Sequence, residues 1–221
     1  MPTAALASVA RVLRLNADTF EEAVEAAAAI LLRGGVVALP TDTLYGISTL
    51  IPYSDRLYAL KKRPYEKPLG IFIPSPQSVP LVARQTISDK LAYRLLPGPV
   101  TLVFERLPAL PPDFNPGVSN VGVRVPDSAI VAAICRKVGQ PLAQTSANIS
   151  GSSLNPTCLE DFEELIPLLD LVIDGGEIQS GSHEGSTIVD LSVPNKFKII
   201  RDGCAKKRTE EVLREFGLDE L

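Results

Sequence analysis

The chain has 221 residues, of which 45% are hydrophobic, 22% charged and 5% aromatic, and it contains no Trp. This length and composition predict a globular protein with one large domain or at most two small ones. The formal net charge of −4 and the few aromatic residues argue against a protein whose main task is to grip nucleic acid, and three scattered cysteines with a single histidine argue against a zinc site or a disulfide framework.

The beginning of the chain has two interpretations. Residues 9–15 (VARVLRL) alternate apolar and basic side chains, as a half-buried strand does. Arg11 and Arg14, without any acid among the first sixteen residues, also resemble a mitochondrial presequence. We favour the strand, because a transit peptide normally extends further. No apolar run in the chain approaches the roughly 20 residues that span a bilayer.

Helices and strands alternate irregularly along the rest of the chain. Apolar periodicity and the Gly and Pro breaks predict helices at residues 20–33, 54–62, 79–83, 88–96, 128–138, 159–169 and 208–216. Short apolar runs predict strands at residues 9–15, 36–39, 69–73, 100–105, 121–125, 141–145, 171–173, 187–191 and 197–200. This order predicts an α/β fold with a twisted, mixed sheet flanked by helices. We expect one domain over residues 8–217, an N-terminal extension at 1–7 and a C-terminal tail at 218–221.

Small polar residues stand at one end of three predicted strands. Thr41, Asp42 and Thr43 come after the second strand, and either bind a ligand or form a turn that caps a helix starting near Leu44. Two further strand ends follow the same pattern, namely residues 145–148 (TSAN) and 186–187 (ST). Three such ends in one small domain favour a shared polar pocket.

Cations cluster after the second predicted helix. Lys61, Arg63 and Lys67 lie within seven positions and can converge on phosphates, although a solvated helix end is the simpler interpretation. Arg124 stands inside an apolar strand and Arg201 ends another. Because Arg is rarely buried without a partner, each takes part in a core salt bridge or faces a pocket that receives a carboxylate.

The common catalytic motifs are missing from the sequence. There is no GxxxxGK[ST], no strand-linked GxGxxG and no GxSxG, and His183 stands alone in a Gly/Ser-rich loop. A P-loop NTPase, a Rossmann dehydrogenase and a Ser-His-Asp triad are therefore unsupported. No catalytic residue is assigned, and catalysis by positioning and charge neutralisation is expected.

Taken together, the motifs resemble one known family. From about residue 12 to residue 217 the chain carries, in the family's order, PTDTLYG, the Lys61-x-Arg63 element with KPL after it, LLPGPVT, VGVRVPD, TSANISG, GSTIVDLS and IIRDG. The set is similar to the YrdC family of threonylcarbamoyl-AMP synthases, in its single-domain animal form. The resemblance implies an open α/β fold with a central polar, basic cavity.

The resemblance also implies a reaction. Members make threonylcarbamoyl-AMP from L-threonine, bicarbonate and ATP with release of pyrophosphate, and a separate complex then transfers the threonylcarbamoyl group to tRNAs that read ANN codons. Motif by motif, L-threonine would bind at Thr43, Arg124 and Ser186. ATP would bind at Lys61, Arg63, Lys67, Ser146, Asn148 and Arg201. Mg²⁺ is expected to come with the triphosphate, and no residue is assigned as its ligand.

Two positions depart from the family pattern. Asp202 puts a negative charge beside Arg201, and Phe72 stands where some microbial members have a polar residue. We expect both to change affinity rather than to abolish activity.

Two other functions compete with the synthase. An RNA-binding module without synthase activity is one, and weak tRNA binding is left open even for an enzyme. The other is the carbamoyltransferase of hydrogenase maturation, which would need further domains and zinc-finger cysteines. For either the enzyme or the RNA-binding module we expect a cytoplasmic protein, with a mitochondrial pool as the alternative.

Overall fold

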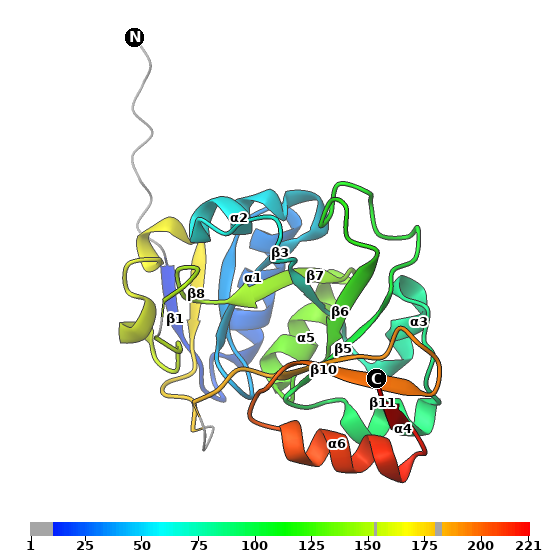
Figure 1. Ribbon diagram of the computed structural model, residues 1–221. Helices are drawn as coiled ribbons and strands as arrows, with labels where there is room; N and C mark the ends of the chain where they lie inside the picture. Colours follow the sequence, from blue (N-terminus) through cyan, green and yellow to red (C-terminus); the bar gives the residue numbers. More distant parts are fainter. Residues whose placement is uncertain (1–10, 153, 180–182) are drawn as a thin grey trace.

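The computed structural model describes residues 11–152, 154–179 and 183–221, and within them one mixed sheet runs through the molecule (Figure 1). Its eleven strands follow the order β1-β8-β2-β3-β7-β4-β6-β5-β9-β10-β11. The strands are β1 (Arg11–Arg14), β2 (Val37–Pro40), β3 (Tyr45–Leu50), β4 (Gly70–Phe72), β5 (Val100–Glu105), β6 (Asn120–Arg124), β7 (Leu142–Ser146), β8 (Leu171–Asp174), β9 (Thr187–Asp190), β10 (Lys196–Arg201) and β11 (Asp219–Glu220). The sheet contains both parallel and antiparallel pairs, so the predicted mixed α/β fold is confirmed.

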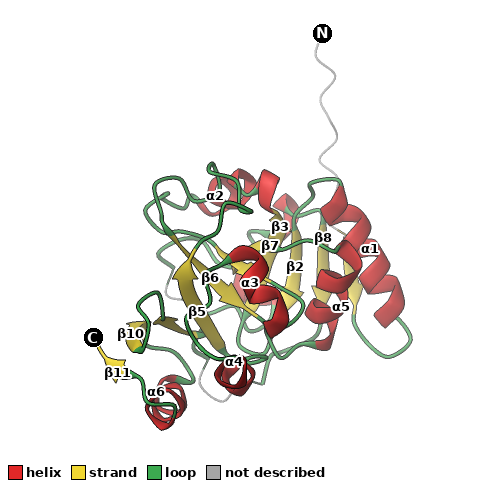
Figure 2. Ribbon diagram, turned by 90° about the vertical axis from the view of Figure 1, so that its right-hand side faces the viewer, coloured by secondary structure: helices red, strands yellow, loops and turns green. Residues whose placement is uncertain are grey.

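Helices cover both faces of this sheet. They are α1 (Phe20–Leu32), α2 (Asp55–Lys61), α3 (Val79–Val82), α4 (Asp89–Leu95), α5 (Ala129–Val138) and α6 (Lys206–Glu215). Figure 2 shows α1 and α5 side by side along one flank. Their apolar faces bury a cluster with alternate residues of the central strands, such as Val37, Leu39 and Phe72. The residues between them, such as Ala38 and Ile71, belong to a larger cluster on the opposite face, which includes residues of α3, α4 and α6.

The hairpin of β2 and β3 differs from the sequence-based expectation. One alternative that the sequence allows is a helix starting near Leu44, but Tyr45–Leu50 is a strand in which all six residues are buried. A central strand that is covered on both faces shows no alternation of apolar and polar residues. The buried Ser48 and Thr49 also resemble turn residues, so the sequence pattern does not indicate a strand here.

Three other expectations also need comment. The helix expected at residues 159–169 consists of two 3₁₀ turns, Leu159–Phe162 and Ile166–Leu168, and Pro167 lies in the second. Residues 218–221, expected as a tail, contain β11, which pairs with β10. The predicted first strand is present as β1, but its residues 9 and 10, like the extension at 1–7, lie outside the described residues. None of the described helices is long and apolar enough to cross a membrane.

Candidate functional site

A cavity of about 680 Å³ lies on the face of the sheet that also carries α1 and α5. Its floor is formed by β7, β4, β6, β5 and β9, and its walls by the turn after β2, the turn after α2 and the loop before β9. Gly70 and Gly122 are neighbours on adjacent strands, since Ile71 pairs with Val123 in parallel register. Both line the cavity, so part of the floor is bare backbone.

The turn between β2 and β3 is shaped by Thr41. Its Oγ1 accepts hydrogen bonds from the backbone N–H groups of Thr43 (3.1 Å) and Leu44 (3.2 Å), and it donates to the carbonyl of Leu44 (2.7 Å). A hydroxyl that binds the backbone two and three residues ahead fixes a tight turn. Thr41 therefore builds the turn, and Thr43, which lines the cavity, is the residue that it presents.

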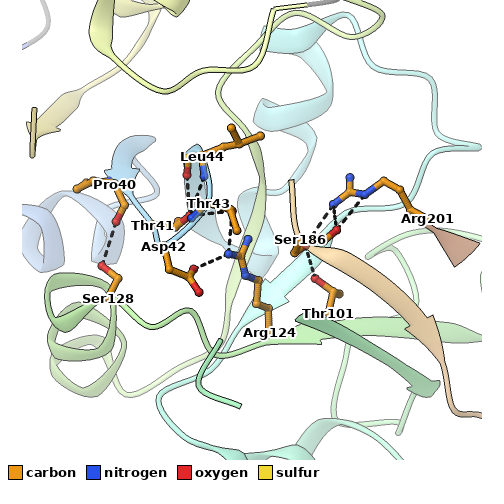
Figure 3. A network of polar contacts seen from close by, with 10 residues as sticks. All are labelled: Pro40, Thr41, Asp42, Thr43, Leu44, Thr101, Arg124, Ser128, Ser186 and Arg201. Atoms are coloured by element: carbon orange, nitrogen blue, oxygen red, sulfur yellow. Dashed lines mark hydrogen bonds and ion pairs between the residues drawn. The ribbon is translucent and has the colours of Figure 1, made fainter. Parts of the chain in front are cut away.

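Arg124 reaches from β6 toward this turn (Figure 3). It is 5% exposed, and its Nη2 donates to Asp42 Oδ1 (2.5 Å) and to Thr43 Oγ1 (2.9 Å). Burial lowers the pKa of Arg124, and the charge of Asp42 opposes that shift. The guanidinium stays charged, so a partly compensated cation faces the cavity beside a hydroxyl.

Ser186 and Arg201 form a second polar group on the other side of Arg124 (Figure 3). The Oγ atoms of Ser186 and Thr101 are 2.9 Å apart, and Arg201 donates to the carbonyl of Ser186 from Nη2 (2.7 Å) and Nε (3.2 Å). Burial lowers the pKa of Arg201, and the charges of Arg124 and Arg63 lower it further. Three arginines thus share one cavity, which favours an anionic ligand.

Lys61 lies beneath the opposite end of the cavity. It is 1% exposed, and its Nζ donates to Thr145 Oγ1 (3.1 Å), to Ser146 Oγ (3.2 Å) and carbonyl oxygen, and to Asn148 Oδ1 (3.4 Å). Burial lowers its pKa from 10.5 to about 7, and the charge of Arg63 adds to the shift. Lys61 therefore binds the side chains of Thr145, Ser146 and Asn148 together, and these three residues form one polar wall of the cavity.

Arg63 follows the end of α2, where Lys62 adopts a left-handed conformation (φ 50°) and stops the helix. Its Nε donates to the carbonyl of Lys67 (2.7 Å) and its Nη2 to that of Pro68 (3.0 Å), so the turn holds the guanidinium at the cavity wall. Lys67 itself has an exposed side chain and does not line the cavity.

Seven of the nine residues assigned by resemblance line this cavity, namely Thr43, Arg63, Arg124, Ser146, Asn148, Ser186 and Arg201. Lys61 lies behind two of them, and Lys67 lies outside. The carboxylate of Asp202 pairs with Lys206 Nζ (2.8 Å) rather than with Arg201, and Phe72 lines the floor. Within the described residues, no group of three or more His, Cys, Asp or Glu side chains could hold a metal ion.

Sequence reasoning missed several lining residues. Thr101 was read only as part of a strand, although its two-residue periodicity placed it on the same face as Val103. Gln144 and Asn120 also line the floor, and no motif in the sequence marks them; Asp190 lines it too and lies inside GSTIVDLS, but its polar side chain was assigned no role. Asp42 was recognised as polar, but nothing in the sequence showed that it pairs with Arg124.

Comparison with known proteins gives concordant results. The family model Sua5/YciO/YrdC, described as telomere recombination, matches residues 29–203. Curated proteins named threonylcarbamoyl-AMP synthase from Bos taurus and Homo sapiens are each 46% identical, over 206 and 207 residues; these alignments cover 89% of this chain and 74% and 73% of the relatives.

Among solved structures, Pyrococcus abyssi Sua5 complexed with L-threonine superposes with a TM-score of 0.82 at 28% identity. The match covers 97% of this chain and 63% of the archaeal one, so this chain spans less than two thirds of that protein's length. The predicted resemblance is confirmed, and the chain belongs to the Sua5/YciO/YrdC family.

Proposed function

We propose that this chain is a threonylcarbamoyl-AMP synthase, which converts L-threonine, bicarbonate and ATP to threonylcarbamoyl-AMP and pyrophosphate. The observation that carries the proposal is the division of one cavity into two polar ends. Arg124, Thr43 and Ser186 surround one end, and Arg63 lies with Ser146 and Asn148 at the other. The names of relatives at 46% identity support the same activity.

At the first end, the carboxylate of L-threonine would bind Arg124, whose fork of N–H donors suits planar anions. The hydroxyls of Thr43 and Ser186 lie on either side of that guanidinium and would orient the amino acid. Its amine then faces the centre of the cavity, where it attacks CO₂ derived from bicarbonate and loses a proton to give a carbamate.

At the second end, Arg63 and the buried Lys61 would neutralise the triphosphate. A carbamate oxygen attacks the α-phosphorus, the bond to the β-phosphate oxygen breaks, and pyrophosphate leaves. No covalent intermediate with the protein is required, so placement of the two substrates and compensation of the charge on phosphorus supply the catalysis. The enclosing walls serve a purpose, because a free carbamate decomposes in water.

Mg²⁺, when bound, would arrive with the triphosphate and compensate part of its charge. Transfer of the product to tRNA by a separate complex, weak binding of tRNA itself, and a cytoplasmic location with or without a mitochondrial pool stay predictions. Fractionation with an antibody to this chain tests the location.

The purified chain should form threonylcarbamoyl-AMP when incubated with ATP, Mg²⁺, bicarbonate and L-threonine, as detected by mass spectrometry. Arg63→Ala and Arg124→Ala should each reduce the rate at least about 100-fold, because each removes a charge-assisted contact made in the transition state. Lys207→Ala is the matched control, since this lysine of α6 is exposed and does not line the cavity, and it should stay within about threefold of wild type.

An absence of product with any combination of substrates, together with RNA binding that falls steeply with salt, would favour the RNA-binding module instead.

A further inference from the structure

Asp42 is the one member of the polar turn without a role in the scheme above. Its side chain is 12% exposed, and Oδ1 pairs with Arg124 Nη2 at 2.5 Å. Its second oxygen, Oδ2, is buried and has no hydrogen-bond partner among the described residues; the same holds for Arg124 Nε. One buried ion pair thus keeps one free acceptor and one free donor, a costly arrangement unless it serves function.

The carboxylate of Asp42 approaches Arg124 from behind the substrate cavity. Arg124 lines the cavity of about 680 Å³, but Asp42 does not. Asp42 instead lines a separate hollow of about 410 Å³, together with Asp127 and Ser128. A ligand in the main cavity therefore meets the guanidinium, and Asp42 acts on that ligand only through Arg124.

The backbone that carries Asp42 is fixed on both sides. Ser128, the residue before α5, donates from Oγ to the carbonyl of Pro40 (3.0 Å). On the other side, Thr41 Oγ1 binds the backbone of Thr43 and Leu44. These bonds hold the turn in place, so the position of the Asp42 carboxylate is fixed. Its ion pair with Arg124 then selects one rotamer of that longer side chain, which otherwise has several.

We propose that Asp42 is a positioning residue that orients the Arg124 guanidinium, and thereby sets the preference of the cavity for an amino acid with a free carboxylate. This proposal rests on the proposed binding of L-threonine. Asp42 and Thr43 both accept from Nη2, so the carboxylate and the hydroxyl together fix the plane of the guanidinium.

A role through charge alone predicts the opposite effect. Asp42 partly neutralises Arg124, so removal of that negative charge would by itself strengthen the attraction between Arg124 and a carboxylate. Loss of orientation weakens it instead, because hydrogen bonds from a planar guanidinium to a carboxylate depend on the angle at which its N–H groups point. The sign of the change in affinity therefore separates the two roles.

The test compares L-threonine with L-threoninamide, which has the same side chain and a neutral amide in place of the carboxylate. Kd values measured by calorimetry give the preference of wild type for the carboxylate. In Asp42→Asn, which keeps the size and one acceptor oxygen, we expect this preference to fall about 10- to 100-fold. The KM for ATP should be unchanged, whereas a general loss of structure would alter both substrates. Asp127→Asn, which removes a carboxylate from the same hollow, should behave like wild type.

An unchanged or increased preference in Asp42→Asn would overturn the proposal. If that variant does not fold, Asp42→Glu replaces it, because this substitution keeps the charge and moves it by one methylene. A reduced preference for L-threonine over L-threoninamide then supports positioning. A preference equal to that of wild type overturns the proposal. If wild type binds neither compound while the folded protein still binds ATP, the proposed function fails at the threonine end, a result distinct from a change confined to the variants.

Discussion

The burial of the Lys61 ammonium makes the stability of the protein depend on pH. Its four acceptors are a carbonyl, two hydroxyls and an amide oxygen, and none carries a negative charge. Hydrogen bonds alone do not replace the lost hydration, so the pKa falls to about 7. An arriving triphosphate would restore the missing charge compensation.

The stability of the protein should rise with pH through this lysine. Between pH 7 and 10.5 the unfolded chain binds a proton at Lys61 that the folded chain releases, so the free energy of unfolding increases with pH in that window. We expect the free energy of unfolding of wild type, minus that of Lys61→Met, to rise by up to about 1.4 kcal/mol per pH unit between pH 7 and 10.5. Below pH 7 this difference should stay constant. Urea unfolding at a series of pH values measures it; curves that stay parallel from pH 7 to 10 would contradict the assigned burial effect.

At the scale of elements, the turn between β10 and α6 approaches the loop before β9 more closely than any side chain allows. A Cβ on Gly203 would lie 2.5 Å from the carbonyl oxygen of Gly185 and 2.5 Å from the backbone nitrogen of Thr187. These are backbone atoms and cannot turn aside. Ser186, between them, belongs to the polar group that meets Arg201, so the contact fixes part of the cavity wall.

Gly203→Ala should therefore damage both stability and the site. We expect a loss of about 1–3 kcal/mol in the free energy of unfolding, as for other overpacked positions, and weaker binding of L-threonine as Ser186 shifts. Gly217→Ala serves as control: its φ of +80° makes the substitution strained, but no atom lies within 4 Å of the added Cβ and the residue does not line the cavity. Equal loss of L-threonine affinity in the two variants would show that the contact at Gly203 does not shape the site.

The elements that the sequence predicted well are those with a local signal. Helix α1 is Ala-rich and ends before Gly34-Gly35, and β5 alternates after a Pro-Gly-Pro break, so both appear near their expected bounds. Strand β3 could not be found in this way, because its pattern depends on layers that cover it from both sides. Likewise, the cavity residues with motif neighbours were identified, whereas the Asp42–Arg124 pair joins positions 82 residues apart through tertiary structure alone.

At the scale of the whole molecule, the central strands hold the two hydrophobic clusters together. Val36 and Val37, or Ile71 and Phe72, are adjacent residues that belong to opposite faces. Neither cluster can come apart without exposing the backbone that supports the other. The described part of the chain is thus expected to unfold as one cooperative unit.

Reporters on opposite faces can test this cooperativity. Tyr45 and Tyr58 lie in the larger cluster, while Cys135, on the buried face of α5, lies in the other, with a pKa raised to about 12 by burial. With Cys158 and Cys204 replaced by Ser, and the exposed Tyr53, Tyr65 and Tyr93 replaced by Phe, the urea midpoints from tyrosine fluorescence and from pulsed alkylation of Cys135 should coincide. Labelling of Cys135 at clearly lower urea would show that α1 and α5 detach first.

Because Gly70 and Gly122 have no side chains, the cavity is deeper at these two positions than it would be with any other residue. A substitution at Gly122 would add atoms 3.0 Å from the methyl group of Thr101, and one at Gly70 would meet the amide of Gln144. Each added methyl would raise the floor beneath any ligand while the polar walls stayed in place. The size of molecule that this scaffold accepts can therefore change by single substitutions at two positions that are neighbours in the sheet, without any change to the charged groups.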